Sequence, residues 1–292
     1  MRFEIVRDIR IFRDMIYPVL MPHIMENNML LGMLETCIAR KEQEPSEQHF
    51  SIVRNNDEIV GAIAQTMPNR PVFSLMSAEV AVFALENWLK NFGSCNTLFG
   101  PETTMNDLLA YIQEKSSDFS PEIERMMSYE LTRVKMPAIR PAGAMRIAES
   151  DDIDLLEEWG VQFTLDCNLP EASSPDLRAV VRKKANQSIA NKSRTIWVVD
   201  GTPVSMAGAV RTAKFGTSVA WVYTPPAHRG KGYASQLVAE LSQHLLDQGA
   251  PRCLLFTDAR NPISNAIYQR IGYRHACDYL LLKNMNDYCL RI

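Results

Sequence analysis

The sequence predicts an α+β protein with two domains, each a mixed, mostly antiparallel β-sheet flanked by helices. Three observations lead to this fold class. The chain has 292 residues, roughly twice the length of a common single domain. Short apolar runs typical of strands are interspersed with amphipathic runs typical of helices. Between Lys135 and Gly143, two prolines and a glycine interrupt both patterns, so we expect domains at residues 1–139 and 140–292.

In the first half, a β-hairpin is the first clear element. Two apolar runs at residues 50–53 and 59–63 flank Asn55-Asn56-Asp57, whose residue types accept the backbone angles of a tight turn. Apolar side chains at helical spacing predict a helix over residues 78–90. A short strand is expected next, at residues 98–101.

The second half contains the same kinds of element. A tight turn at Asp200-Gly201 joins two strands, and Gly249 and Pro251 end a helix, as their backbone preferences predict. The expected elements are, in chain order, a strand at 145–148, a helix through Trp159, strands at 196–199, 204–211 and 217–223, a helix from Gly232, a strand at 253–257, a helix at 264–271 and a strand at 279–282.

The elements of the two halves can be aligned, but the number of residues that separates matching elements changes along the chain. The hairpin turns align at 144 residues, which takes Asn56 onto Asp200, and the later strands align at 157 residues, which takes Leu98 onto Leu255. The difference, 157 minus 144, is 13 residues, and it falls where the second half has a glycine-rich loop. We therefore expect an internal duplication in which only the second copy kept a working site.

Composition limits the classes of protein to which the chain can belong. Hydrophobic residues are 46% of the chain, charged residues are 22%, and the net charge is -3, all typical of a globular protein. Without an excess of positive charge, we expect no nucleic-acid partner. Residues Met1 to Asp8 mix both charge signs with no apolar stretch behind them. We therefore expect neither a signal peptide nor a membrane anchor, and a cytoplasmic location.

Cysteines and histidines are dispersed along the chain. The six cysteines form no C-x-x-C pair, and the five histidines form no cluster with metal-ligand spacing. We expect reduced, mostly buried thiols and no metal site.

The segment from Val222 to Ser235 is the most informative part of the sequence. It contains Arg229-Gly230-Lys231-Gly232-Tyr233-Ala234 between a predicted strand and a predicted helix. Two glycines let the backbone curl closely around a ligand, while the helix directs unpaired N–H groups and the positive end of its dipole to the same point. A pyrophosphate group is the natural occupant, held mainly by the main chain.

Three other interpretations of this loop remain to be weighed. A Walker loop needs a serine or threonine after the lysine, but Gly232 follows Lys231, which excludes it. A dinucleotide-binding fold requires an acidic residue, which Asp258 could supply, and a third glycine, whose place Ser235 occupies. This fold therefore remains only as an alternative. A tight turn without any ligand is the third interpretation.

The segment Asp258-Ala259-Arg260-Asn261-Pro262, continuing through Ser264-Asn265 and Tyr268 to Gly272-Tyr273, adds a second signal. Together with the loop before it, this segment resembles the GNAT acetyltransferase superfamily, whose loop has the form Arg/Gln-x-x-Gly-x-Gly/Ala. The resemblance covers about residues 143 to 292. More narrowly, the sequence is similar to a bacterial tandem form with a degenerate amino-terminal GNAT-like domain.

The resemblance implies a set of site residues. The main chain of Val222, Tyr223 and Thr224 would hydrogen-bond the pantetheine arm of coenzyme A like an added strand, and strand 254–257 would splay away. Asn261 and Asn265 would lie near the thiol. Tyr268, one turn beyond Asn265, would face the same cleft. The diphosphate would lie on the loop formed by Arg229, Gly230, Lys231, Gly232, Tyr233, Ala234 and Ser235.

Tyr268 is our candidate general acid. An amine attacks the thioester carbonyl, and the departing thiolate needs a proton, which a phenol can supply because free thiols and phenols differ by about two pK units. The base is undecided among Asp166, Glu171 and Asp258.

We therefore expect an N-acetyltransferase that uses acetyl-CoA as co-substrate and a small amine or a protein amino terminus as acceptor. A non-catalytic acyl-CoA sensor is the first alternative, and a dinucleotide-binding oxidoreductase is the second. The first half lacks the loop, so we expect it not to bind coenzyme A but to wall the acceptor channel or stabilise the catalytic half.

Overall fold

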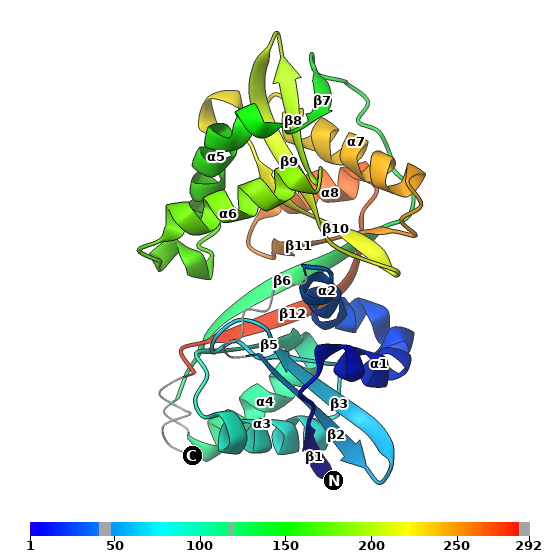
Figure 1. Cartoon of the computed structure of the whole chain (residues 1–292), viewed down its shortest axis with the longest axis vertical. Coiled ribbons are helices and arrows are strands. Elements are labelled where there is room, and N and C mark those ends of the chain that lie inside the picture. The colour runs from blue at the N-terminus through cyan, green and yellow to red at the C-terminus, as the bar shows by residue number, and fades with distance from the viewer. Residues whose placement is uncertain (41–47, 117–118, 286–292) are drawn as a thin grey trace. The chain divides into compact units, whose positions relative to one another are not determined.

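A computed structural model describes residues 1–40, 48–116 and 119–285, which form two compact units (Figure 1). The first unit comprises Met1–Tyr129, Phe256–Pro262 and the segment from His275, and the second comprises Glu130–Leu255 and Ile263–Arg274. Each unit contains a mixed β-sheet flanked by helices, which confirms the predicted α+β fold class.

The first half of the chain begins with a strand and two helices, continues through three strands, and ends with helix, strand, helix and strand. These elements are β1 (Arg2–Ile5), α1 (Ile9–Leu20), a short 3-10 turn (Met21–His23), α2 (Ile24–Arg40), β2 (His49–Asn55), β3 (Glu58–Gln65), β4 (Val72–Phe73), α3 (Ala78–Phe92), β5 (Thr97–Pro101), α4 (Glu102–Lys115) and β6 (Glu122–Leu131).

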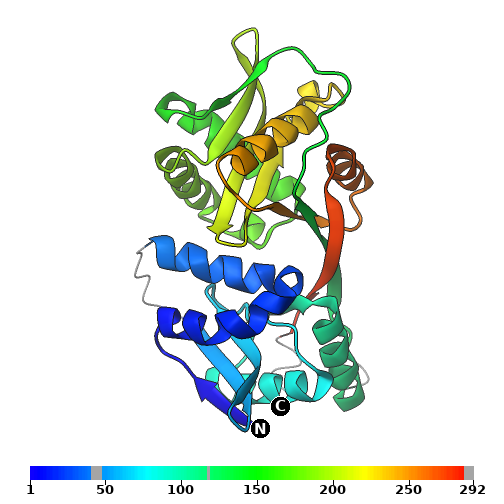
Figure 2. The same ribbon diagram turned by 90° about the vertical axis from the view of Figure 1, so that its right-hand side faces the viewer.

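The sheet of the first unit is completed by a strand from the end of the chain. Its strands lie in the order β1-β2-β3-β4-β5-β12-β6, where β12 is Arg274–Lys283. Strand β4 runs parallel to β5, whereas β12 runs antiparallel to β5, with Tyr279 opposite Pro101. Helices α3 and α4 pack on each other, as do α1 and α2 (Figures 1 and 2). Trp88, Leu98 and Leu282 belong to the core beneath α3 and α4.

The second half has the same succession of element types. They are β7 (Ala144–Ile147), a 3-10 turn (Ser150–Asp152), α5 (Ile153–Asp166), a 3-10 turn (Pro170–Ser173), α6 (Leu177–Ala190), β8 (Arg194–Val199), β9 (Thr202–Ala213), β10 (Gly216–Tyr223), a 3-10 turn (Pro226–His228), α7 (Tyr233–Asp247), β11 (Cys253–Asp258), α8 (Pro262–Ile271) and β12.

In the second unit the strands lie in the order β11-β10-β9-β8-β7. Strands β7 to β10 pair antiparallel with their neighbours, and β10 pairs with β11 in parallel. Helices α5 and α6 pack on each other over one face of this sheet, and α7 covers the other face (Figures 1 and 2). The core under α5 and α6 includes Leu156, Ile196 and Tyr223.

The two halves therefore share one order of elements: strand, two helices, three strands, helix, strand, helix, strand. Their hairpin turns also match in conformation, because Asn56 and Asp200 both adopt a left-handed backbone, with φ of 53° and 48°. This order supports the predicted duplication.

The compact units do not coincide with the predicted ranges 1–139 and 140–292. Residues from Glu130 lie in the second unit, whereas the end of β11 and most of β12 lie in the first. Strand β11 thus begins in one unit and ends in the other. The boundary at residues 139 and 140 remains a prediction of where the second domain begins in sequence.

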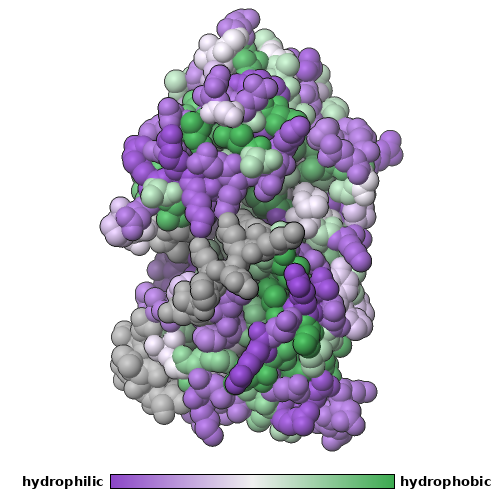
Figure 3. Space-filling view, in the orientation of Figure 1, coloured by the Kyte–Doolittle hydropathy of each residue, from purple (hydrophilic) through white to green (hydrophobic). Residues whose placement is uncertain are grey.

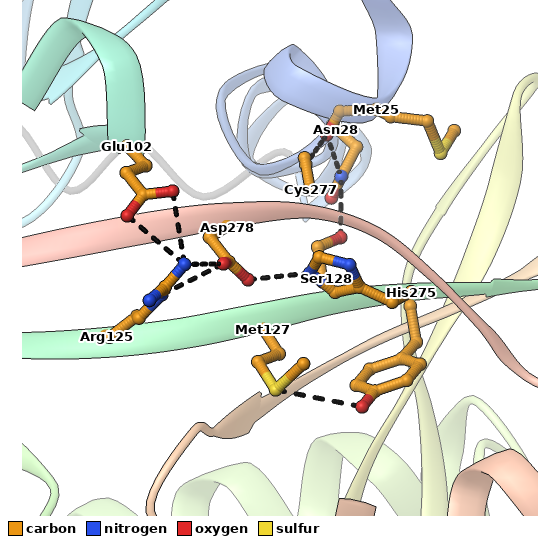
Figure 4. A network of polar contacts seen from close by, with 10 residues as sticks. Met25, Asn28, Glu102, Arg125, Met127, Ser128, His275, Cys277 and Asp278 are labelled. Carbon is orange, nitrogen blue, oxygen red and sulfur yellow. Dashed lines mark hydrogen bonds and ion pairs between the residues drawn. The ribbon is translucent and has the colours of Figure 1, made fainter.

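A polar network joins β6 to β12 inside the first unit (Figure 4). The Asp278 carboxylate accepts a hydrogen bond from Arg125 Nε at 2.9 Å and is 2.7 Å from His275 Nε2, and its side chain is only 8% exposed. On helix α2, Asn28 Nδ2 donates to Ser128 Oγ of β6 at 3.3 Å, and the Met25 carbonyl accepts from Cys277 Sγ. These contacts hold the late strand in the sheet of the early unit.

The described helices include none that is long and apolar enough to cross a bilayer. The molecular face in Figure 3 carries mostly hydrophilic side chains, with hydrophobic ones interspersed.

Helix α5 is anchored to β7 through Asp152. The Arg146 guanidinium donates to both carboxylate oxygens of Asp152, at 2.6 and 2.7 Å, and the Glu149 N–H donates to the same carboxylate at 2.8 Å. The Arg146 side chain, followed by the Glu149 backbone, holds the pKa of Asp152 below its usual value, against burial, which raises it. The start of α5 is thereby fixed to the edge of the sheet.

We expect Asp152→Asn to lower the free energy of unfolding by about 1–2 kcal/mol at neutral pH, because the charge-assisted hydrogen bonds are weakened. A carboxylate whose pKa is lowered by folding stabilises the folded state above about pH 4 and loses that contribution as the pH falls. Denaturant titrations should therefore show the difference between variant and wild type shrinking from about pH 6 to pH 3.

The exposed neighbour Asp151 provides the control, since Asp151→Asn should leave the unfolding free energy nearly unchanged. A difference for Asp152→Asn that stays constant across this pH range would contradict the proposed role of the ion pair.

Candidate functional site

Strand β10 carries a β-bulge close to its end. Its pairing with β9 shifts register between Ala220 and Tyr223, and Trp221 adopts a left-handed backbone with φ of 58°. A bulge bends the strand and redirects its side chains, and such irregularities often lie beside binding sites. The predicted residues Val222, Tyr223 and Thr224 directly follow this point.

Strands β10 and β11 separate soon after they begin. They pair in parallel only at Thr217 with Cys253 and at Ser218 with Leu254, and the residues of β11 after Leu255 belong to the first unit. Within the described part of the second unit, the main chain of β10 beyond Ser218 therefore pairs on one side only, with β9. This geometry agrees with the predicted splaying of residues 254–257.

Two side chains fix the end of β10. Ser205 of β9 donates from Oγ to the Tyr223 carbonyl at 3.0 Å, and its Oγ lies 2.8 Å from Thr224 Oγ1. Arg229 Nε donates to the Thr224 carbonyl at 2.9 Å. The strand end and the loop that follows are thus tied together.

The loop between β10 and α7 leaves the start of α7 without a side-chain cap. Gly230 and Gly232 have φ of 78° and 82°, and Gly232 is the N-cap of α7, which no side chain caps. A Cβ atom added at either glycine would meet nothing within 4 Å, so conformation rather than crowding requires glycine here. The first N–H groups of a helix lack intrahelical acceptors and lie at the positive end of its dipole, which suits an anion.

The two basic side chains of the loop, Arg229 and Lys231, differ in their surroundings. Arg229 Nη2 lies 2.8 Å from Asp166 Oδ2 at the end of α5, and the guanidinium stands 5.8 Å from the centre of the Tyr223 ring. Lys231 is exposed. The charge of Arg229 is therefore balanced by Asp166, and the main-chain amides remain the principal candidates for holding an anion.

The first half has no counterpart of this loop. Only four residues, Ser74 to Ser77, join β4 to α3, whereas nine residues, Thr224 to Gly232, join β10 to α7. Ser77, the N-cap of α3, has an extended backbone. The shorter connection leaves no glycine-rich curl before α3.

Tyr268 lies buried on α8, with 8% of its surface exposed. Its ring meets that of Tyr273 edge-on at 5.9 Å, and the Tyr273 hydroxyl lies 2.8 Å from Ser242 Oγ on α7. Burial, and to a lesser degree the Cys167 thiol at the end of α5, raise the pKa of Tyr268 above its usual value. The phenol is therefore protonated at neutral pH, but its acidity lies further from that of a thiol than the free groups suggest.

The two predicted asparagines fall in different units. Asn265 lies on α8 in the second unit, together with Tyr268. Asn261 lies at an exposed turn in the segment that belongs to the first unit, and its N–H donates to the Asp258 carbonyl at 3.0 Å. Their predicted position near the thiol stays a prediction.

The candidate bases differ in their surroundings. Asp166 is paired with Arg229. The Arg260 side chain donates to both carboxylate oxygens of Asp258 and lowers its pKa, which makes that carboxylate a weaker base. The side chain of Glu171 lies outside the described part of the structure. The base is not identified by these contacts.

No group of three or more His, Cys, Asp or Glu side chains in the described residues is arranged to hold a metal ion. The described cysteines Cys37, Cys95, Cys167, Cys253 and Cys277 form no disulfide bond with one another, and Cys289 lies outside the described residues.

Sequence reasoning missed three residues around the bulge. Trp221 was assigned only to a strand, and Ser205 and Arg194 carried no motif. Their positions depend on which residues of β8 and β9 lie opposite the bulge, which sequence spacing alone does not reveal.

A comparison with protein families matches residues 154–273 to the model described as "Acetyltransferase (GNAT) family". A comparison with curated proteins gives no significant match.

Solved structures of similar fold cover nearly the whole chain. An acetyltransferase from the GNAT family of Colwellia psychrerythraea has 13% identity and a TM-score of 0.56, covering 97% of this chain and 100% of that one. A GCN5-related N-acetyltransferase from Sphaerobacter thermophilus has 15% identity and a TM-score of 0.61, covering 85% and 84%. A tandem GNAT protein from the clavulanic acid biosynthesis pathway has 11% identity and a TM-score of 0.55, covering 97% and 99%. At these low sequence identities, the structural similarity shows a common fold and no more.

Proposed function

Because residues 154–273 match the model of the GNAT acetyltransferase family, we propose that this protein is an N-acetyltransferase that moves the acetyl group of acetyl-CoA to a primary amine. The observation that carries the proposal is the pairing of two features in one short segment: the one-sided strand end at Val222 to Thr224 and the uncapped helix start at Gly232. A bound molecule that is extended at one end and anionic at the other matches this pair of features.

The diphosphate of coenzyme A would lie at the start of α7. Gly230 and Gly232 turn the backbone so that successive amides can converge on one anion, and the macrodipole of the 15-residue helix adds to their attraction. Arg229 contributes by holding the loop against Thr224 and Asp166 rather than by a direct contact.

The pantetheine arm would extend along β10. Beyond Ser218, this strand has β9 on one side and no paired strand of its own unit on the other, among the described residues. An amide-containing chain can hydrogen-bond such an edge as an added strand does. Ser205 keeps the edge in place from the β9 side.

The neutral acceptor amine attacks the carbonyl carbon of the thioester to form the C–N bond, and its nitrogen gives up one proton to solvent. The tetrahedral intermediate then collapses to the amide, and the C–S bond breaks to release the thiolate. In this proposal the Tyr268 hydroxyl gives its proton to the sulfur. Burial keeps the phenol protonated at neutral pH, as a proton donor requires. The thiolate leaves into the same dry site, where it is also a stronger base than in water, which offsets the raised pKa of the phenol.

Calorimetric titration tests coenzyme binding. We expect acetyl-CoA to bind with a dissociation constant in about the micromolar range, and Gly232→Ala to weaken binding about tenfold, because a left-handed backbone costs a residue with a Cβ about 1–2 kcal/mol.

Gly201→Ala is the matched control, since Gly201 also has a positive φ of 76° and open space around it but lies in the β8–β9 hairpin. It should lower stability similarly and keep the affinity. A folded wild-type protein that gives no heat with millimolar acetyl-CoA would overturn the proposal.

Steady-state kinetics test the role of Tyr268. We expect Tyr268→Phe to lower kcat about 100-fold while acetyl-CoA binding is retained, because only the proton donor is removed. Tyr273→Phe serves as the control: it loses the hydrogen bond to Ser242 and some stability, but keeps turnover. Equal loss of kcat in both variants would argue against an acid role, and coenzyme binding without turnover by the wild type in an amine screen would favour an acyl-CoA sensor.

A further inference from the structure

Arg194 is a buried arginine to which the proposed reaction assigns no role. It is the first residue of β8, in the second unit, and only 5% of its surface is exposed. Its Nε and Nη1 atoms are buried and make no hydrogen bond to any described residue. Buried guanidinium groups are ordinarily paired, so this side chain is an exception that calls for a physical explanation.

The Arg194 guanidinium lies near Gly208 and Trp221, next to the β-bulge. Arg194 lies opposite Gly208 of β9, and a Cβ atom at position 208 would stand 3.1 Å from Nη1. The Arg194 Cζ atom is also 4.9 Å from the centre of the Trp221 ring. The guanidinium therefore lies close both to a glycine and to an aromatic ring, and that aromatic residue directly precedes Val222.

The charge of Arg194 is not balanced by a carboxylate. Burial lowers the pKa of the guanidinium to about 9, and no acidic side chain contributes to this shift. The group thus remains cationic at neutral pH, and a buried cation without a partner costs several kcal/mol. Arg229, which stands over the other aromatic residue of this strand, is paired with Asp166 instead.

A second cation lies on the same ring. Lys184 Nζ of α6 is 5.6 Å from the centre of the Trp221 ring, and Phe163 of α5 packs against that ring at 5.1 Å. The Trp221 ring, under α5 and α6, thus lies against one aromatic ring and two cationic side chains. Such a site attracts an anion and repels a polycation.

We propose that Arg194 binds a carboxylate of the acceptor, so that the acceptor is an amino acid or another amine that carries a carboxylate. This inference rests on the proposed function, because it places the acceptor beside the strand assigned to the thioester arm. A carboxylate can receive two parallel hydrogen bonds from a guanidinium, a match that a single phenol or amide does not provide. Polyamines, which carry only positive charge, are disfavoured by the same geometry.

The rival explanation is structural: the guanidinium serves only to pack on Trp221. The two explanations differ in their consequences. A purely structural arginine makes Arg194→Met destabilising whatever anion is present. A binding arginine makes Arg194→Met neutral or stabilising without ligand, because an unpaired buried charge is removed, and abolishes the effect of carboxylates.

The first measurement is thermal unfolding without coenzyme at fixed ionic strength. The probes are N-acetylated α- and ω-amino acids, which resemble the product, and their uncharged amides. We expect at least one carboxylate at about 10 mM to raise the midpoint of the wild type by a few degrees, its amide to have no effect, and Arg194→Met to show no response to either. Arg182→Met, at an exposed arginine of α6, should respond as the wild type does.

The second measurement is thiol release from acetyl-CoA with triplets of amino acid, amino-acid amide and decarboxylated amine. We expect kcat/KM for the best amino acid to exceed that of its amide at least tenfold. Arg194→Met should bring this ratio close to one, mainly through KM, and Arg194→Lys should restore part of it, because it returns the charge without the planar fork.

The outcomes separate the two proposals. If no amine is acetylated but carboxylates still stabilise the wild type and not Arg194→Met, the anion site stands and the transfer proposal fails. If uncharged amines are acetylated as well as amino acids, and Arg194→Met changes neither that ratio nor the thermal response, the transfer proposal stands and the carboxylate site is overturned. A loss of stability in Arg194→Met, without any carboxylate response in the wild type, also overturns the site and assigns Arg194 to packing.

Discussion

The proposed coenzyme site depends on the early separation of two parallel strands. If β10 and β11 paired along their full length, the edge of β10 from Val219 onward would be occupied by β11, and no extended molecule could bind it. The bulge at Trp221 adds to this effect by bending β10 away from regular pairing with β9. Because β11 pairs with β10 only at its first two residues, the unpaired edge of β10 is a consequence of strand pairing rather than of any one side chain.

The repeated order of elements shows why the proposed site falls in the second half and not in the first. In both halves a helix follows the fourth strand. The nine residues before that helix in the second half are long enough to form the glycine-rich loop, whereas the four residues in the first half are not. The first half instead makes a direct connection from Phe73 to α3, and Trp88 of α3 packs in a dry core. The late strand β12 then joins the sheet of the first unit through contacts such as the hydrogen bond between Arg125 and Asp278.

The sequence predicted the fold class, both hairpins, the glycine-rich loop and the elements after it, because each has a local signal in residue type or period. It did not predict α1, although Phe12, Ile16 and Leu20 recur at helical spacing and Asp8 caps the helix, since Pro18 lies inside that helix and masks the pattern. The sequence also did not predict the raised pKa of Tyr268 or the unpaired, buried guanidinium of Arg194, because burial and cross-strand neighbours are properties of the folded chain.

The central claim is that the start of α7 holds the diphosphate of coenzyme A. A crystal structure of the full chain with acetyl-CoA tests it most directly. We predict diphosphate oxygens within about 2.7–3.2 Å of main-chain amides between Gly230 and Ser235, with the pantetheine arm along Val222 to Thr224. A diphosphate bound elsewhere on the protein, with these amides facing solvent, would contradict the claim.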